Sequence, residues 1–335
     1  MARRERTTAL PKHRPRVRAR TGTRTVAGLT VEDRHIRFGI LGAAAALLVL
    51  VVSVLAWGIF SDNYRKPAET VVRVGDQSAS LRYFADRLLP FAQANKDSSL
   101  TLVEQGLLNK LADEFLTVEL ARDRGIDLSE DAVLLAIADD LGVPVGGDGS
   151  AFDNLYRQRV KALGMSTDNY RRLIMAQLAD AKLREQVKIA AGDKGEAVTV
   201  RMVVVAHKDL ADKLAARIKG GDDMGTIAQT DSIDFETKSE DGVRQATPPE
   251  LFPAAVSAAL ASTPDGQLAG PVEVDGNFWL VRVDKRDKEF TYTDAQKNDL
   301  IVVRFEALLK EQRAITPPTI SFDSSDAKWA EANAR

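Results

Sequence analysis

The longest apolar run of the chain has 23 residues without a charge, from Phe38 to Phe60. A helix rises about 1.5 Å per residue, so this run can cross a hydrocarbon core of about 30 Å. It is longer than the apolar region of a cleaved signal peptide, and it is not followed by a small-x-small cleavage site. A buried core helix is not expected either, because the run is so long and is flanked by Arg37 and Arg65. The sequence therefore predicts a single transmembrane helix over residues 38–60.

The next part of the chain has the periodicity of packed helices. Val71 to Val74 is predicted to be a strand, which ends in a turn at Gly75. The clearest helix runs over 103–124, because apolar residues recur there at spacings of three and four. Further helices are expected up to about 141, over 152–163 and after Ser166. The face of the 103–124 helix consists of Leu107, Leu108, Leu111, Phe115 and Val118. Residues 68–195 are therefore predicted to form a mostly helical lobe.

A change in composition marks a second region, which is predicted to be a small α/β domain over 196–288. It opens with a β-branched strand from Val198 to Val205. A hairpin is expected near its end, because Asp275-Gly276 is a strong turn signal between two apolar runs. The other expected elements are a helix over 210–219, a polar surface loop over 231–249, an Ala-rich helix over 249–260 and hairpin strands over 271–274 and 278–283.

The last region, 289–335, is predicted to begin with a helix from Asp294 to Gln312. Leu300, Val303 and Leu308 give this helix an apolar stripe, and two prolines follow it. The remaining tail is expected to add one strand and one turn of helix.

Charge is distributed unevenly along the chain. Residues 1–37 carry 11 Lys and Arg against 3 Asp and Glu, a net charge of +8, whereas the rest carries 35 against 45, a net charge of −10. Because basic residues stay on the cytoplasmic side, we expect a single-pass protein of the cell membrane with a cytoplasmic N-terminus and an extracytoplasmic body. The tail 1–37 lacks periodic apolar residues and is expected to be disordered. It could contact anionic lipid, but nucleic-acid binding is not favoured, because no aromatic residue or folded motif accompanies the basic run.

The residue inventory excludes several classes of chemistry. The chain has no cysteine and only three histidines. Disulfides, thiolate metal sites and cysteine nucleophiles are therefore excluded. His207 is the only imidazole after the apolar run, and no GxSxG motif or phosphate-binding glycine loop occurs. We expect no cofactor and no metal, and His207 is interpreted as a solvated loop residue.

Several segments together resemble the foldases that join a SurA-type chaperone lobe to a parvulin-type, or PpiC-like, peptidyl-prolyl isomerase domain. The resemblance covers about 68–315. It implies an α+β fold in which the parvulin-like domain is inserted before a C-terminal helix that packs back on the chaperone lobe. It also implies binding of unfolded, newly exported polypeptides. The segments are Val71–Leu81, Leu107–Val133 and Met165–Val187 for the lobe, and Ala211–Ala228, Gly266–Val272 and Phe278–Val283 for the isomerase domain.

The same resemblance places the isomerase site. The two family histidines fall on Met202 and Trp279, and the acidic member falls on Asp234. Weak or absent isomerase activity is therefore expected, with Asp234 as the one candidate catalytic residue. Apolar side chains could still form a shallow groove that binds substrate, or they could simply be core. These side chains are Met202, Met224, Phe252, Phe278 and Trp279.

Three functions remain open from the sequence. The favoured one is a membrane-anchored chaperone for exported polypeptides, with a degenerate isomerase site. The alternatives are an active prolyl isomerase and a structural subunit that docks on a fixed partner in a membrane complex.

Overall fold

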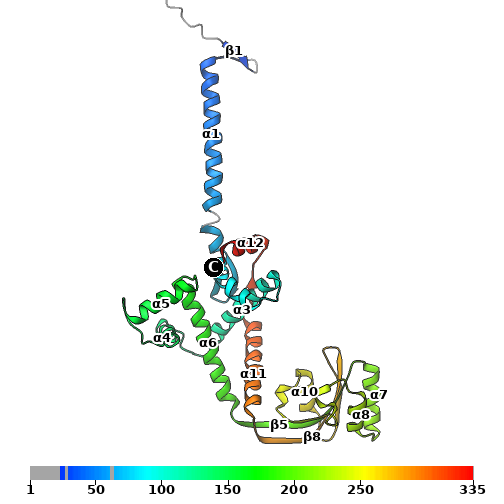
Figure 1. Ribbon diagram of the computed structural model, residues 1–335. Helices are drawn as coiled ribbons and strands as arrows, with labels where there is room; N and C mark the ends of the chain where they lie inside the picture. The colour runs from blue at the N-terminus through cyan, green and yellow to red at the C-terminus, as the bar shows by residue number, and fades with distance from the viewer. Residues whose placement is uncertain (1–22, 27–28, 61–63, 335) are drawn as a thin grey trace, which may run out of the picture. The chain divides into compact units, whose positions relative to one another are not determined.

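The computed structural model describes the chain except for residues 1–22, 27–28, 61–63 and 335 (Figure 1). Side chains are not described for residues 23–26, 29–44 and 59. The chain divides into two compact units, residues 1–67 and 68–335.

The first unit contains a hairpin and one long helix. Strands β1 (Thr23–Val26) and β2 (Leu29–Glu32) pair in antiparallel fashion, and α1 runs from Asp33 to Phe60. The hairpin departs from the disorder expected for 1–37, since its Thr and Val residues favour strands; residues 1–22 of that tail lie outside the described residues. Among the helices whose side chains the structure describes, none is long and apolar enough to cross a membrane. The predicted span 38–60 lies partly outside those residues.

The second unit begins with a small sheet that is packed against helices. Its strands are β3 (Thr70–Val74), β4 (Gln77–Ser80) and β9 (Thr319–Ile320), in the order β4-β3-β9. Helix α2 (Leu81–Ala94) follows, and the side chain of its N-cap Ser80 accepts a hydrogen bond from the Tyr83 N–H. Helix α12 (Ser324–Asn333) packs on α2, and the Phe84 and Phe322 rings lie 4.8 Å apart. The two ends of this unit therefore share one core.

Further helices complete the helical part of this unit. Helices α3 (Leu100–Asp123) and α6 (Thr167–Ala191) pack on each other, and α4 (Glu130–Leu141) and α5 (Ala151–Ala162) pack beside α6. Helix α11 (Asp294–Ile315) then returns along α3 and α6 (Figure 1). On α11, Leu300 and Phe305 are buried. Val303 was predicted to lie on the apolar stripe of this helix, but it is 37% exposed.

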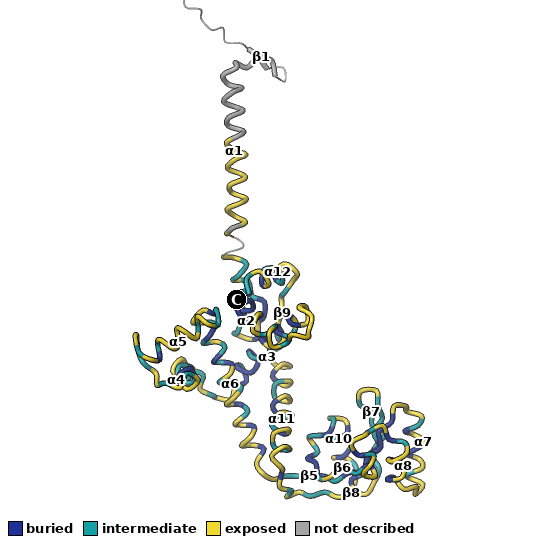
Figure 2. Tube along the Cα trace, viewed as in Figure 1, coloured by how far each residue is buried: buried dark blue, intermediate teal, exposed yellow. Residues whose placement is uncertain are grey.

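The mixed part of the unit is built on a four-stranded antiparallel sheet. Its strands are β5 (Lys194–Val205), β6 (Val243–Thr247), β7 (Leu268–Val274) and β8 (Asn277–Thr291), in the order β6-β5-β8-β7. Helices α7 (Lys208–Lys219) and α8 (Met224–Asp231) cover one face, and α10 (Ala254–Ser262) covers the other (Figure 1). Each face buries its own apolar cluster, so the sheet has a core on both sides (Figure 2).

The segment 231–249 differs from its prediction. It was expected to be a polar loop, but it contains α9 (Phe235–Lys238) and the edge strand β6. The 3₁₀ turn η3 (Pro249–Leu251) then precedes α10, so the Ala-rich helix begins later than predicted. These elements were not predicted because the segment is polar, and an edge strand, which pairs on one side only, needs few apolar residues.

Candidate functional site

The α10-facing side of the sheet holds three of the residues assigned to the site from the sequence. Met202 on β5 lies opposite Val281 on β8, and Trp279 lies opposite Val204. Residues opposite each other in an antiparallel pair share a face, so Met202 and Trp279 point to the same side. Phe252, which follows η3, packs into the same cluster. Met202, Phe252 and Trp279 are thus brought together.

Met224 and Phe278 lie on the other side of the sheet. Both belong to the cluster beneath α7 and α8. Phe278 and Trp279 are neighbours on a strand, and successive side chains of a strand point to opposite faces. The sequence left open whether the five apolar residues line one groove or belong to the core, and in this structure they lie on opposite faces of the sheet.

Burial further limits what these residues can bind. Met202 is 1% exposed, Met224 1% and Phe252 4%, whereas Phe278 and Trp279 are only partly buried. The guanidinium of Arg244 lies 5.1 Å from the centre of the Phe252 ring. Met202, Met224 and Phe252 therefore act as core residues in this structure, because their surfaces are occupied by protein atoms.

Asp234 lies in a turn that runs along the edge of β5. The Ile233 N–H donates to the Val204 carbonyl over 2.8 Å, and the Met202 N–H donates to the Gly242 carbonyl over 2.8 Å. The Asp234 carboxylate accepts a hydrogen bond from the Thr237 hydroxyl at 2.6 Å. This carboxylate is thus held by its own turn, next to the backbone of the strand that carries Met202.

Gly242 is required for this turn. Its φ of +74° lies in the left-handed region, and an added Cβ would come within 2.5 Å of the Met202 carbonyl oxygen. A side chain at this position would therefore push the turn away from β5.

The imidazole of His207, the only one after the apolar run 38–60, does not assist the Asp234 carboxylate. His207 is an exposed residue that precedes α7, and its side chain makes no capping hydrogen bond. It comes directly after the solvent-exposed Ala206 at the end of β5. This matches the interpretation of His207 as a solvated residue.

A cleft of about 680 Å³ lies between α2, α3, α6 and α11. Phe91, Leu173, Phe305 and Leu309 give it an apolar lining, and charged side chains surround them. The guanidinium of Arg184 lies 4.1 Å from the centre of the Phe305 ring. Arg184 also donates to Asp180 over 2.8 Å. The cleft therefore combines apolar contact area with paired charges.

A partly buried ion pair lies in one wall of this cleft. Arg87 donates to both carboxylate oxygens of Glu114, over 3.0 and 2.8 Å, and to the Tyr83 hydroxyl over 3.0 Å. Burial opposes the charge on Arg87, but the bonds to Glu114 and Tyr83 outweigh it and raise the pKa of the guanidinium. Burial also raises the pKa of Tyr83. This ion pair links α2 to α3.

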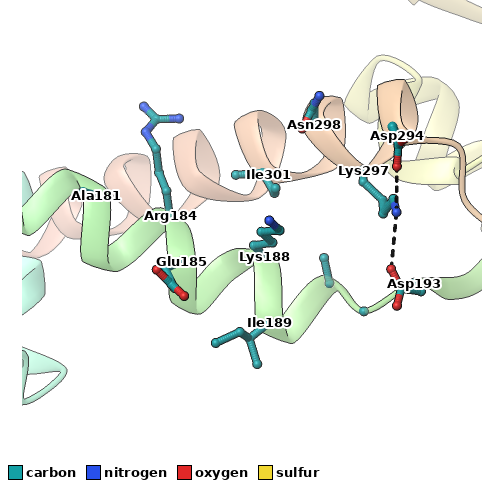
Figure 3. Close-up of a pocket in the computed structure, with 12 residues that line it drawn as sticks. Ala181, Arg184, Glu185, Lys188, Ile189, Asp193, Asp294, Lys297, Asn298 and Ile301 are labelled. Atoms are coloured by element: carbon teal, nitrogen blue, oxygen red, sulfur yellow. Dashed lines mark hydrogen bonds and ion pairs between the residues drawn. The ribbon is translucent and has the colours of Figure 1, made fainter.

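A second cleft, of about 850 Å³, opens between the C-terminal end of α6 and the N-terminal end of α11 (Figure 3). Lys297 bridges Asp294 on its own helix, at 2.9 Å, and Asp193 at 3.4 Å. Asp193 lies just before β5, and Asp294 lies just after β8. Lys297 therefore links the two segments in which the chain passes between the helical part and the sheet. Arg184 borders both clefts.

Comparison with known proteins assigns both parts of the chain. Residues 34–184 match the SurA-like N-terminal domain, and residues 185–296 match the PPIC-type PPIASE domain. The chain therefore joins a SurA-like N-terminal domain to a PPIC-type PPIase domain.

Individual relatives are distant. Chaperone SurA of Yersinia pestis bv. Antiqua and that of Yersinia pseudotuberculosis are each 25% identical over 268 residues, which is 69% of this chain and 60% of theirs. The chain thus matches less than two thirds of the SurA length. The crystal structure of PrsA from Bacillus anthracis has 15% identity and a TM-score of 0.37, and covers 66% of this chain and 94% of its own. PrsA from Bacillus cereus has 14% identity and a TM-score of 0.38, and covers 80% and 100%.

Sequence reasoning missed the clefts of this SurA-like domain. Phe91 and Arg184 were not singled out, and Phe305 lay beside the stripe predicted for its helix. A signal existed for Phe305, because it is the one aromatic residue in the 294–312 helix and lies five residues after Leu300. The partners of Phe305 could not be found, because the contact with Arg184 joins two helices that are more than 100 residues apart.

Proposed function

We propose that this chain is a chaperone that binds unfolded, newly exported polypeptides in its SurA-like domain. The observation that carries the proposal is the cleft between α2, α3, α6 and α11. An apolar lining with charges around it can hold a mixed, unfolded sequence without demanding one motif. The net charge of −10 after residue 37 favours solubility and basic clients.

The PPIC-type domain of the proposed chaperone is a weak or inactive isomerase. Rotation about an X–Pro bond has a barrier of about 18–20 kcal/mol, and polar groups around the twisted amide would have to lower it. Met202 and Trp279 stand where the family pattern has histidines, and Met202 is buried. Asp234 is engaged with Thr237. These features support a domain that retains the fold but lacks the polar assistance, which is commonly worth about 10²- to 10⁴-fold.

Membrane anchoring forms part of the proposal and rests on the sequence. The uncharged run 38–60 and the +8 tail before it favour a single span with the body outside the cytoplasm. This position would place the chaperone where exported polypeptides emerge.

Aggregation of an unfolded client, followed by light scattering, tests the role of the cleft. We expect Phe91→Ser and Leu173→Ser to weaken suppression several-fold, because each removes apolar contact from the cleft lining. Leu135→Ser is the matched control, since Leu135 lies on α4 outside the cleft and is 63% exposed. If the cleft variants and the control suppress aggregation as well as the unchanged chain, the cleft is not the binding site.

A further inference from the structure

A turn of the PPIC-type domain exposes two apolar side chains. Phe235 is 87% exposed, the highest value among the large apolar side chains that the structure describes, and Ile233 is 44% exposed. Exposing an aromatic ring to this extent leaves most of its apolar area in water, and such residues often mark interaction sites. We name residues 231–241 the acidic turn.

The backbone fixes these side chains outward. Ser232 and Asp234 have extended dihedral angles, φ −70° and ψ 139° for Ser232 and φ −80° and ψ 101° for Asp234. Ile233 and Phe235 therefore alternate with the inward residues of the turn. The Ser232 hydroxyl accepts hydrogen bonds from the N–H groups of Val204 and Asp234, each at 3.2 Å. Because the turn is pinned to β5 in this way, the exposure of Phe235 is a property of the folded domain.

The charge around the two side chains is strongly negative. The turn contains five carboxylates and one lysine, Lys238. None of the five forms an ion pair with any residue that the structure describes. The Lys238 ammonium donates instead to the carbonyls of Thr230 and Ser232, at 3.4 and 2.9 Å. The five carboxylates are those of Asp231, Asp234, Glu236, Glu240 and Asp241.

Three of these carboxylates are held by local hydrogen bonds. Asp241 accepts from the Gln229 amide at 2.6 Å, Asp231 from the Thr230 hydroxyl at 2.9 Å, and Asp234 from the Thr237 hydroxyl at 2.6 Å. These neutral donors orient the carboxylates without cancelling their charge. Elsewhere in the domain, acidic residues such as Asp222 and Asp284 are paired with arginines. Arg201 donates to the Asp241 carbonyl over 3.0 Å, but its guanidinium pairs with the Asp284 carboxylate. The acidic turn therefore keeps a net charge of −4, five carboxylates against one lysine, around an apolar centre.

We propose that the acidic turn docks an extended, cationic segment of a client polypeptide, with an apolar side chain of the client resting on Phe235 and Ile233. Lysine or arginine residues on either side of that side chain would face the carboxylates. The inference rests on the proposed chaperone function and names the chemistry of the client segment. It places a second contact on the PPIC-type domain, separate from the cleft of the SurA-like domain.

Charge complementarity selects this occupant. Anionic lipid and nucleic acid would be repelled by the five carboxylates, and so would the same turn of a second copy. The basic tail 1–37 of the chain itself has the right charge, so the experiment includes it as a competing occupant.

Fluorescence anisotropy with two labelled peptides tests the proposal on the full-length chain. The first peptide is unstructured and alternates lysine with phenylalanine and serine; the second has glutamate in place of lysine. We expect the lysine peptide to bind and the glutamate peptide not to bind. Phe235→Ala should weaken binding by at least about fivefold, the effect of losing a central aromatic contact. Glu236→Gln combined with Glu240→Gln should weaken binding and reduce its dependence on salt.

The matched control is Ile189→Ala on α6, where Ile189 is 73% exposed and lies outside the turn. Phe235 is exposed, so its replacement should leave thermal unfolding unchanged. Equal binding by the Phe235→Ala and Ile189→Ala chains would overturn the proposal. So would a several-fold rise in peptide affinity on deleting residues 1–37, because the tail would then be the occupant.

Failure of this inference can be told from failure of the proposed function. Suppression of aggregation is measured in parallel with an unfolded client that has few charged residues, which should not use the acidic turn. If Phe235→Ala lowers peptide binding but the unchanged chain does not protect this client, docking stands and the cleft proposal fails. If the client is protected but Phe235 has no effect on the peptide, the docking proposal fails alone.

Discussion

Replacing Phe252 with alanine tests whether this side chain is a core residue or a residue that binds clients. The sequence assigned Phe252 to a substrate groove, but the side chain is 4% exposed and packs in the cluster beneath α10. Truncating a buried phenylalanine commonly costs about 3–5 kcal/mol, and the contact with Arg244 adds about 0.5–1 kcal/mol. We therefore expect Phe252→Ala to lower the free energy of unfolding of the PPIC-type domain by about 4 kcal/mol.

Urea unfolding read by hydrogen exchange gives this value for the domain within the full-length chain. With a slope of about 2 kcal/mol per molar urea, the midpoint for peptides from 196–288 should fall by about 2 M. Phe235→Ala is the control and should shift it by less than about 0.3 M, because an exposed side chain contributes little to stability. In conditions where the domain is folded, Phe252→Ala should bind clients normally. If Phe252→Ala keeps the urea midpoint but loses client affinity, Phe252 is a binding residue of a groove and not a core residue.

Three further predictions concern the turn beside β5, a buried carboxyl and the topology. Gly242→Ala should destabilise the PPIC-type domain by more than about 2 kcal/mol in the same urea assay, because the new Cβ would meet the Met202 carbonyl, whereas Gly276→Ala, with open space around it, should cost about 1 kcal/mol. Burial, and secondarily the charge of Glu331, raise the pKa of Glu104 above its ordinary value of 4.5, so the folded state binds a proton more tightly than the unfolded state and loses stability as pH rises from 4.5 through the raised pKa. Glu104→Gln should therefore raise the melting temperature at pH 7 but not at pH 4, and an equal rise at both would contradict this. Protease added to cells stripped of their wall should digest the body and spare the basic tail; a protected body would exclude the proposed topology.

Local patterns were sufficient for many elements of the fold. The helix predicted over 103–124 is α3, and its apolar face at Leu107 and Leu111 is fully buried. The hairpin across Asp275-Gly276 is confirmed, with Val274 paired to Asn277. These features depend on neighbours within a few residues, so periodicity and turn chemistry are enough to specify them.

Long-range packing explains what the sequence did not predict. Helix α2 was missed, because Pro90 inside it interrupts the helical pattern. Phe278 and Trp279 were both candidates for one groove, but the pleat of β8 puts them on opposite faces of the sheet. The exposure of Phe235 depends on how Ser232 bonds to β5, about 30 residues earlier. None of these can be read from a local window, because each depends on which segments meet in the fold.

Parallel assays of isomerisation and client protection decide whether the chain is a chaperone with a weak or inactive isomerase site. The full-length chain is added to a proline-containing peptide, whose cis-to-trans rate is followed, and to an unfolded client, whose aggregation is followed by light scattering. We expect clear suppression of aggregation and an isomerisation rate close to the uncatalysed one, because Met202 and Trp279 supply no polar assistance. A strong isomerase rate that survives Asp234→Ala would contradict this expectation, because catalysis would then depend on residues assigned here to packing.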